Sequence, residues 1–218
     1  ATRTAYSSGY RYLMVHAVSG VMLLAGIVLF YGETGSLAFE QMQATSLPFY
    51  LILLGLLINA AVPPFHAWLS DAYPEATITG VIFLSALTTK TAVYTLIRGF
   101  PGTDFLIWLG VIMALLGVVY GILANDIRRL LAYSIISQVG YMVAAVGMGT
   151  VIALNGATAH AFTHILYKSV LFMAAGAVIT MTGKSKLTEL GGIYKYMPIT
   201  FLLYMVGAAS ISAFPLFS

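Results

Sequence analysis

One segment of this chain carries residue types that could transfer protons. In the stretch ATAHAFTHILYKSVLFMAA, His160, His164 and Lys168 follow one another at intervals of four residues. On a helix this spacing places the three side chains on one face, about one turn apart. Almost all of their neighbours are apolar, and a lysine at the centre of a bilayer costs roughly 2.5–3.5 kcal/mol on insertion scales. The pattern therefore points to the holding or passing of protons.

The composition is that of an integral membrane protein. Of the 218 residues, 60% are hydrophobic and 8% are charged, and the mean hydropathy is +0.94. Soluble domains have roughly 25% charged residues. Repeated apolar runs of about 20 residues predict a polytopic α-helical fold, because lipid admits only helices or closed barrels, and the short alternating segments of barrels are not seen.

Several kinds of activity lack the residues that they need. The chain has no cysteine, which excludes disulfides, thiolate chemistry and iron–sulfur ligation by this segment. We find no nucleotide-binding loop, nucleophile triad or haem motif. His160 and His164 could ligate a metal from successive turns, but no third ligand lies nearby on that helix. We therefore expect no catalytic residue, no cofactor, no bound metal and no nucleic-acid partner.

The apolar runs predict about seven transmembrane helices. They lie at about 10–31, 47–62, 77–98, 105–124, 130–148 and 151–181, and from 198 onward. Pro63 and Pro64 should break the second helix, since two prolines remove two backbone donors. A break at membrane depth needs protein or a water-filled cavity around it. The alternative is an ordinary helix end followed by an amphipathic loop.

The sixth run, 151–181, is longer than a straight crossing requires, so a tilt or an internal irregularity is expected. The chain opens without a signal peptide and ends inside an apolar run. We expect residues 1–218 to form a single transmembrane domain that is the central piece of a longer protein.

Further polar residues inside the spans could support a proton pathway. Lys90 lies among threonines, which favours a hydrated interior face, although snorkelling to the nearby interface is the alternative. Asn59 precedes the break and His66 follows it. One face of the fifth helix carries four polar side chains that could glue helices together or hold a water wire, namely Ser134, Ser137, Gln138 and Tyr141.

The charged residues predict an orientation. If the broken segment counts as one crossing, seven basic residues share one side: Arg3, Arg11, Arg128, Arg129, Lys184, Lys186 and Lys195. The other side has Glu33, Glu40, Arg98 and Asp104. Excess Lys and Arg mark the cytoplasmic side, so the amino end of the segment should be cytoplasmic. We expect the cell inner (plasma) membrane of a bacterium.

A second segment of the sequence weakly resembles the segment at the break; we call this similarity the internal echo. INAAVPPFH and ISAFPLFS both run from an apolar helix into small residues and a proline, and by the crossing count they enter the membrane from opposite sides. Broken helices of opposite orientation are typical of inverted-repeat transporters.

Four ordered blocks carry a resemblance to a known family. They are VPPFHAWLSDAYPEA with LSALTTKTAVYTLIR, NDIRRLLAYSIISQVGYM, ATAHAFTHILYKSVLFMAAGAVI, and LTELGGIYKYMP. The chain resembles the antiporter-like membrane subunits shared by respiratory complex I (NADH:quinone oxidoreductase), Mrp-type multisubunit Na⁺/H⁺ antiporters and membrane-bound hydrogenases. Among these it is most similar to the Mrp D-type subunit.

The resemblance implies two inverted five-helix repeats, each with a broken helix, around a hydrated axis of charged residues. It also implies that the protein partners are other membrane subunits. The transported ions would be protons, with Na⁺ as an alternative ion that moves in the opposite direction. On this chain Lys90 matches the family's connecting lysine, and His160, His164 and Lys168 match its central helix. Asp71, Pro74 and His66 match the short loop motif after the first break.

Two departures from the family pattern leave two functions open. Asn59, which cannot be protonated, stands where the family usually has a lysine, and the family's terminal acidic and basic groups would lie outside residues 1–218. The first hypothesis is a proton-translocating subunit that relays H⁺ along the Lys/His axis, within a translocase such as NADH:quinone oxidoreductase or a cation/proton antiporter. The alternative is a non-conducting scaffold subunit with one defective half-channel. A free-standing solute transporter is disfavoured, because the spans lack carboxylates for hard cations or amines.

Overall fold

The computed structural model describes residues 2–42 and 46–215, and within them regular structure is helical. Five stretches are long and apolar enough to cross a membrane, and α2 and α9 are shorter apolar helices. The prediction of an all-α bundle of about seven spans, one of them broken, is therefore confirmed. The elements in chain order are α1 (Arg3–Thr34), α2 (Leu47–Asn59), α3 (Ala67–Glu75), α4 (Ile78–Phe83), the π-helical turn η1 (Leu84–Thr88), α5 (Thr89–Gly99), α6 (Phe105–Leu123), α7 (Ile127–Met148), α8 (Val151–Thr182), the 3₁₀ turns η2 (Leu187–Glu189) and η3 (Ile193–Lys195), and α9 (Pro198–Ile211).

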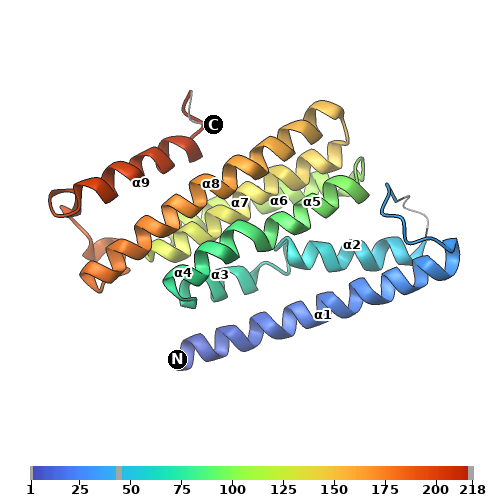
Figure 1. Cartoon of the computed structure of the whole chain (residues 1–218), viewed down its shortest axis with the longest axis horizontal. Coiled ribbons are helices and arrows are strands. Elements are labelled where there is room, and N and C mark those ends of the chain that lie inside the picture. The colour runs from blue at the N-terminus through green and yellow to red at the C-terminus, as the bar shows by residue number, and fades with distance from the viewer. Residues whose placement is uncertain (1, 43–45, 216–218) are drawn as a thin grey trace.

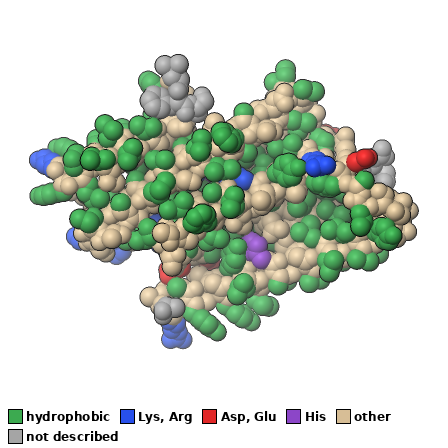
Figure 2. All heavy atoms as spheres, in the orientation of Figure 1, with side chains coloured by type: hydrophobic (Ala, Val, Ile, Leu, Met, Phe, Trp, Pro, Cys, Tyr) green, Lys and Arg blue, Asp and Glu red, His purple; other side chains and the backbone are tan. Residues whose placement is uncertain are grey.

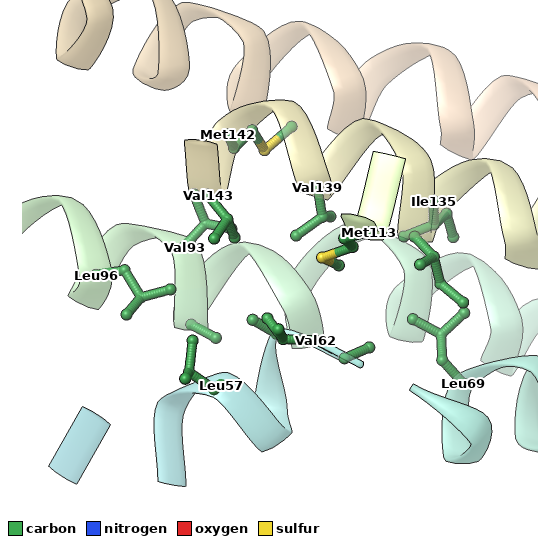
Figure 3. Packing of buried hydrophobic residues seen from close by; sticks show 14 of the residues in the cluster. Leu57, Val62, Leu69, Val93, Leu96, Met113, Ile135, Val139, Met142 and Val143 are labelled. Atoms are coloured by element: carbon green, nitrogen blue, oxygen red, sulfur yellow. The ribbon is translucent and has the colours of Figure 1, made fainter. Parts of the chain in front are cut away.

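Helix α7 is the centre of the bundle, with α6 against one side and α8 against another (Figure 1). Close approach of α6 and α7 depends on small residues: a Cβ added at Gly117 would lie 2.4 Å from the backbone nitrogen of Ser137. The apolar side chains of α7 meet those of α5, α6 and the α2–α3 region in one core, part of which Figure 3 shows. The polar groups described below are thus embedded in a packed interior.

The second helix breaks as predicted, but it ends at Asn59, before the two prolines. Ala61 adopts a left-handed conformation with φ 58°, which stops the helix. The N–H of Val62 donates to the Leu57 carbonyl (3.0 Å), and the N–H of Ala61 donates to the Ile58 carbonyl (3.1 Å). This pair of bonds is a Schellman motif, with alanine where glycine is usual.

The segment after the break is a helix, so the alternative of an amphipathic loop is wrong. Asp71 and Pro74, which we assigned to a short loop, both lie on α3. Pro74 is the second-to-last residue of this nine-residue helix, which continues through it to Glu75 although proline donates no backbone hydrogen bond. Trp68 fixes α3 against the end of α2, since its indole N–H donates to the Ile58 carbonyl at 2.9 Å.

The echo between the two apolar segments has a structural counterpart. Helix α9 ends at Ile211, and Ala213 follows with φ 52°. The N–H of Phe214 donates to the Ala209 carbonyl (3.0 Å) and that of Ala213 to the Ser210 carbonyl (3.1 Å), the same pattern as at the end of α2. Helices α2 and α9 also run in opposite directions (Figure 1). The last three residues of the echo, 216–218, lie outside the described residues.

An irregularity occurs in the third span rather than in the sixth. Helix α8 is uninterrupted α-helix from Val151 to Thr182, so the expected internal irregularity there is wrong and a tilt stays a prediction. The third span, Ile78–Gly99, contains the π-helical turn η1 between α4 and α5. π-helical turns inside α-helices are frequent at functional sites.

Polar side chains fix the ends of α7 and α8 to each other. Asp126 caps α7 by accepting from the backbone N–H groups of Arg128 (3.0 Å) and Arg129 (2.9 Å). The turn before α7 then pairs with the segment after α8: Asn125 Nδ2 donates to Thr188 Oγ1 (3.0 Å), and the Thr188 N–H donates to Asn125 Oδ1 (3.2 Å).

Two of the basic residues predicted to lie on the cytoplasmic side bind groups on and just after α3, at one end of the bundle. Arg11 pairs with Asp71 at 3.0 Å, and Arg128 Nη1 donates to the carbonyls of Pro74 (2.9 Å) and Ala76 (2.8 Å). Arg98 lies at the other end, where its Nε donates to the Phe39 carbonyl at 3.2 Å. Figure 2 shows most blue side chains gathered toward one end. The orientation in the membrane stays a prediction.

Candidate functional site

Lys168 is completely buried on α8. Its Nζ donates to the hydroxyl of Ser134 on α7 and, at 3.4 Å, to the Leu131 carbonyl on the same helix. The Ser134 hydroxyl donates to that same carbonyl at 2.9 Å. The interior ammonium group thus has two neutral oxygen acceptors and is shielded from the surface of the bundle.

Lys90 is also buried, 6% exposed, and is the second residue after the π-helical turn. Its Nζ donates to the Ser85 carbonyl (2.7 Å) and to Thr89 Oγ1 (3.1 Å). The side chain therefore turns back into the bundle and does not extend toward Arg98 and the interface. Snorkelling, the alternative considered for this lysine, does not occur.

His164 is the third buried titratable residue of the site. Its side chain is fully buried, and its ring centroid lies 6.0 Å from that of His160. Neither ring nitrogen of His164 has a hydrogen-bond partner in the described part of the chain, and the same holds for Nε2 of His160. Both imidazoles can accept or release a proton without first breaking a protein hydrogen bond.

The cluster of Lys90, His164 and Lys168 has no carboxylate partner within residues 2–42 and 46–215. The two ion pairs found there, Arg11–Asp71 and Lys186–Glu189, are largely solvent-exposed and lie outside the cluster. Burying several unpaired charges together is expensive, because desolvation and mutual repulsion act in the same direction. The three groups can therefore share charge but cannot all carry it at once.

Comparisons with known proteins identify the family of the chain. The model of the family described as NADH:quinone oxidoreductase/Mrp antiporter, transmembrane, matches residues 1–218. The chain belongs to this family. It is therefore an integral membrane protein of the group that includes complex I subunits and Mrp antiporter subunits.

Relatives in this family come from different complexes. The chain is 32% identical to NADH-quinone oxidoreductase subunit N of Desulforudis audaxviator, over 98% of this chain and 47% of that protein. It is also 32% identical to a probable K⁺/H⁺ antiporter protein of Rhizobium meliloti, over 94% of this chain and 22% of that protein. The chain thus spans about half or less of the length of these curated relatives.

Solved structures of the family have the same fold. A chain of the Mrp complex from Dietzia sp. DQ12-45-1b superposes with a TM-score of 0.90 at 28% identity, covering 99% of this chain and 43% of that one. A chain of the membrane-bound sulfane sulfur reductase, an archaeal respiratory membrane complex, gives a TM-score of 0.90 at 27% identity, covering 99% and 48%.

The polar face of α7 in this antiporter-family chain divides into two parts. Ser134 contacts Lys168, whereas Ser137 packs against Gly117 of α6 and has an interhelical packing role. Gln138 lines a cavity of about 270 Å³ together with both serines. Tyr141 is 56% exposed and lines a different cavity, of about 240 Å³, with His160. One predicted stripe therefore faces two cavities.

Asn59 and His66 do not join the Lys/His cluster. Asn59 is the half-buried last residue of α2, and His66 is the half-buried N-cap of α3. In the described ranges, no hydrogen bond or ring contact connects either residue to Lys90 or Lys168. Their predicted supporting role stays a prediction.

Sequence reasoning missed Tyr73 and the backbone of the π-helical turn. Tyr73 is fully buried on α3, and its hydroxyl donates to the Leu84 carbonyl at 2.8 Å. Its position in the amphipathic stretch between Asp71 and Pro74 was the available signal, since a tyrosine buried there needs a partner for its hydroxyl.

Proposed function

We propose that this chain is the central part of a proton-translocating membrane subunit. The proton would pass between Lys90, His164 and Lys168, with His160 at one end of the row and Ser134 as an acceptor on α7. The observation that carries the proposal is the burial of three protonatable groups together without a carboxylate. A purely structural role would not require so costly a cluster.

Charge repulsion supplies the driving step of the relay. A proton that arrives on one member of the cluster raises the free energy of a proton on the next, and so promotes its departure. Groups coupled this strongly titrate as a set rather than singly. His164 suits the middle position, because it is buried on the same face of α8 as Lys168 and its two ring nitrogens have no hydrogen-bond partner among the described residues.

The relay needs an energy source outside this chain. Relatives are named as components of NADH-quinone oxidoreductase and of a probable K⁺/H⁺ antiporter, and a structural neighbour belongs to an Mrp complex. We infer that neighbouring membrane subunits supply it, either through redox chemistry in a partner or through a counter-moving cation such as Na⁺.

The test compares two lysine substitutions in the full-length protein, assembled in its complex and reconstituted in liposomes with a trapped pH-sensitive dye. Lys168→Met should lower the initial rate of coupled proton movement by about a hundredfold or more, the size of typical proton-transfer contributions. Lys184→Met, at an exposed position just after α8, is the matched control and should keep the parental rate. An assembled Lys168→Met protein with the parental rate would rule out the relay.

A non-conducting scaffold subunit is the second candidate. It is favoured by Asn59, which ends the first half of the broken helix and cannot be protonated. In that case Lys168→Met would change assembly without changing proton movement per assembled complex.

A further inference from the structure

Tyr73 connects the broken helix to the π-helical turn. Its side chain lies on α3, in the second half of the broken span, and is completely buried. The phenolic O–H donates a 2.8 Å hydrogen bond to the carbonyl of Leu84, the first residue of η1. A backbone carbonyl inside a transmembrane segment is thus bound by a side chain from a different element.

The next carbonyl of the same turn is the acceptor of Lys90. The Lys90 Nζ lies 2.7 Å from the Ser85 carbonyl oxygen, the shorter of its two hydrogen bonds. In a π-helical turn the backbone bonds run from residue i to i+5 in place of i+4, so carbonyls are displaced from their α-helical directions. Tyr73 and Lys90 therefore bind adjacent carbonyls in a segment whose backbone depends on being held out of the regular α-helix.

The ring of Tyr73 is fixed on two sides. Its centroid lies 6.1 Å from the ring of Trp68 on the same helix and 6.4 Å from that of Phe172 on α8. Phe172 is four residues after Lys168, so it lies on the same face of α8, one turn away. The phenol has little freedom to leave the Leu84 carbonyl while α3 and α8 keep their positions.

We propose that Tyr73 is a positioning residue for Lys90: its hydroxyl holds η1 in the form that presents the Ser85 carbonyl to the Lys90 ammonium. This inference rests on the proposed function, since it assigns to the relay a control point at the broken helix. A movement of α3 would be transmitted through one hydrogen bond to the acceptor of the first lysine.

The consequence of losing this bond follows from simple electrostatics. Without the phenolic donor, the Leu84 carbonyl loses its side-chain hydrogen bond and η1 relaxes toward regular helix, which removes the Ser85 acceptor from Lys90. A hydrogen bond to the charged form of a group favours that form, so protonation of Lys90 then requires more acidic conditions. The other groups whose charge acts on Lys90, or on which it acts, are Lys168, His164 and His160, all on α8, and they are unchanged.

The experiment measures the pH dependence of coupled proton movement in the full-length protein within its reconstituted complex. Tyr73→Phe should displace the pH profile toward acid by about one unit, the equivalent of an ordinary hydrogen bond. The control is Tyr133→Phe, which removes a hydroxyl from a ring stacked on Tyr120. It should keep the parental profile, whatever its rate.

A Tyr73→Phe protein with the parental pH profile would overturn the inference, even if its rate were lower, because a structural role alone changes the rate. If that variant does not assemble, 3-fluorotyrosine at position 73 preserves the shape and strengthens the O–H donor. It should displace the profile in the opposite direction, and an unmoved profile would again overturn the inference. The relay itself fails separately, if Lys90→Met and Lys168→Met both retain the parental rate.

Discussion

Lys168 of α8 and Ser134 of α7 are joined by a hydrogen bond from the ammonium group to the hydroxyl, and both donate to the Leu131 carbonyl. The three groups form a small network with neutral acceptors only. A carboxylate in place of Ser134 would hold the proton on Lys168 strongly. A hydroxyl solvates the charged lysine without trapping it, which suits a group that must both receive and release a proton.

Removing the hydroxyl should slow the relay. Ser134→Ala leaves the charged form of Lys168 with one long hydrogen bond, a loss of roughly 1–2 kcal/mol that corresponds to about a five- to thirtyfold lower rate of proton movement. The matched control is Ser169→Ala on α8, where the hydroxyl bonds only to the Ile165 carbonyl of its own helix. Equal rates for the two variants, measured per assembled complex in liposomes, would contradict the assigned role of Ser134.

Asn59 separates the two candidate functions. In a conducting subunit, Asn59→Lys adds a protonatable group at the end of α2 and should change the number of protons moved per turnover of the complex. In a scaffold subunit the same change should leave this number unaltered. Asn59→Gln is the control, because it preserves the amide and adds no titratable group. The measurement is the ratio of proton uptake to substrate turnover in reconstituted complexes.

The left-handed alanine at the first break makes a prediction about stability. A non-glycine residue with positive φ costs roughly 1–2 kcal/mol, so Ala61→Gly should relieve strain. Ala60 is the control, since it is equally buried but has φ −76°, and Ala60→Gly should destabilise by about 1 kcal/mol. Thermal denaturation of the detergent-solubilised protein should therefore place Ala61→Gly above Ala60→Gly. The reverse order would show that the backbone strain at Ala61 is negligible.

Much of the fold could be predicted from the sequence, because hydrophobic run length and proline position are local signals. The predicted span 105–124 became Phe105–Leu123, and the predicted break is present, although α2 ends at Asn59, before Pro63 and Pro64. The loop assigned to Asp71 and Pro74 was wrong, since tertiary contacts such as the bond from Trp68 to the Ile58 carbonyl hold a helix there in spite of the proline. Composition gave too weak a signal to resolve a nine-residue helix.

The inward direction of Lys90 was harder to predict. Its threonine neighbours favoured an interior face, but the decisive group is the Ser85 backbone carbonyl, displayed by a π-helical turn. That turn depends on tertiary contacts such as the one from Tyr73, which no periodicity reveals. On α7, Ser137 takes the interhelical role that the stripe had left open, because the missing side chain of Gly117 lets α6 approach and cover it.

The reciprocal bonds between Asn125 and Thr188 have a mechanical consequence. Together with the backbone bonds from Ile127 N–H to Ser185 (2.9 Å) and from Leu187 N–H to Asn125 (2.8 Å), they clamp the start of α7 to the end of α8. These bonds join the two helices at one end of the bundle, and the bond from Lys168 to Ser134 joins them again within it. We therefore expect any change in the gap between Lys90 and Lys168 to arise in the third span, where the π-helical turn η1 interrupts the α-helix.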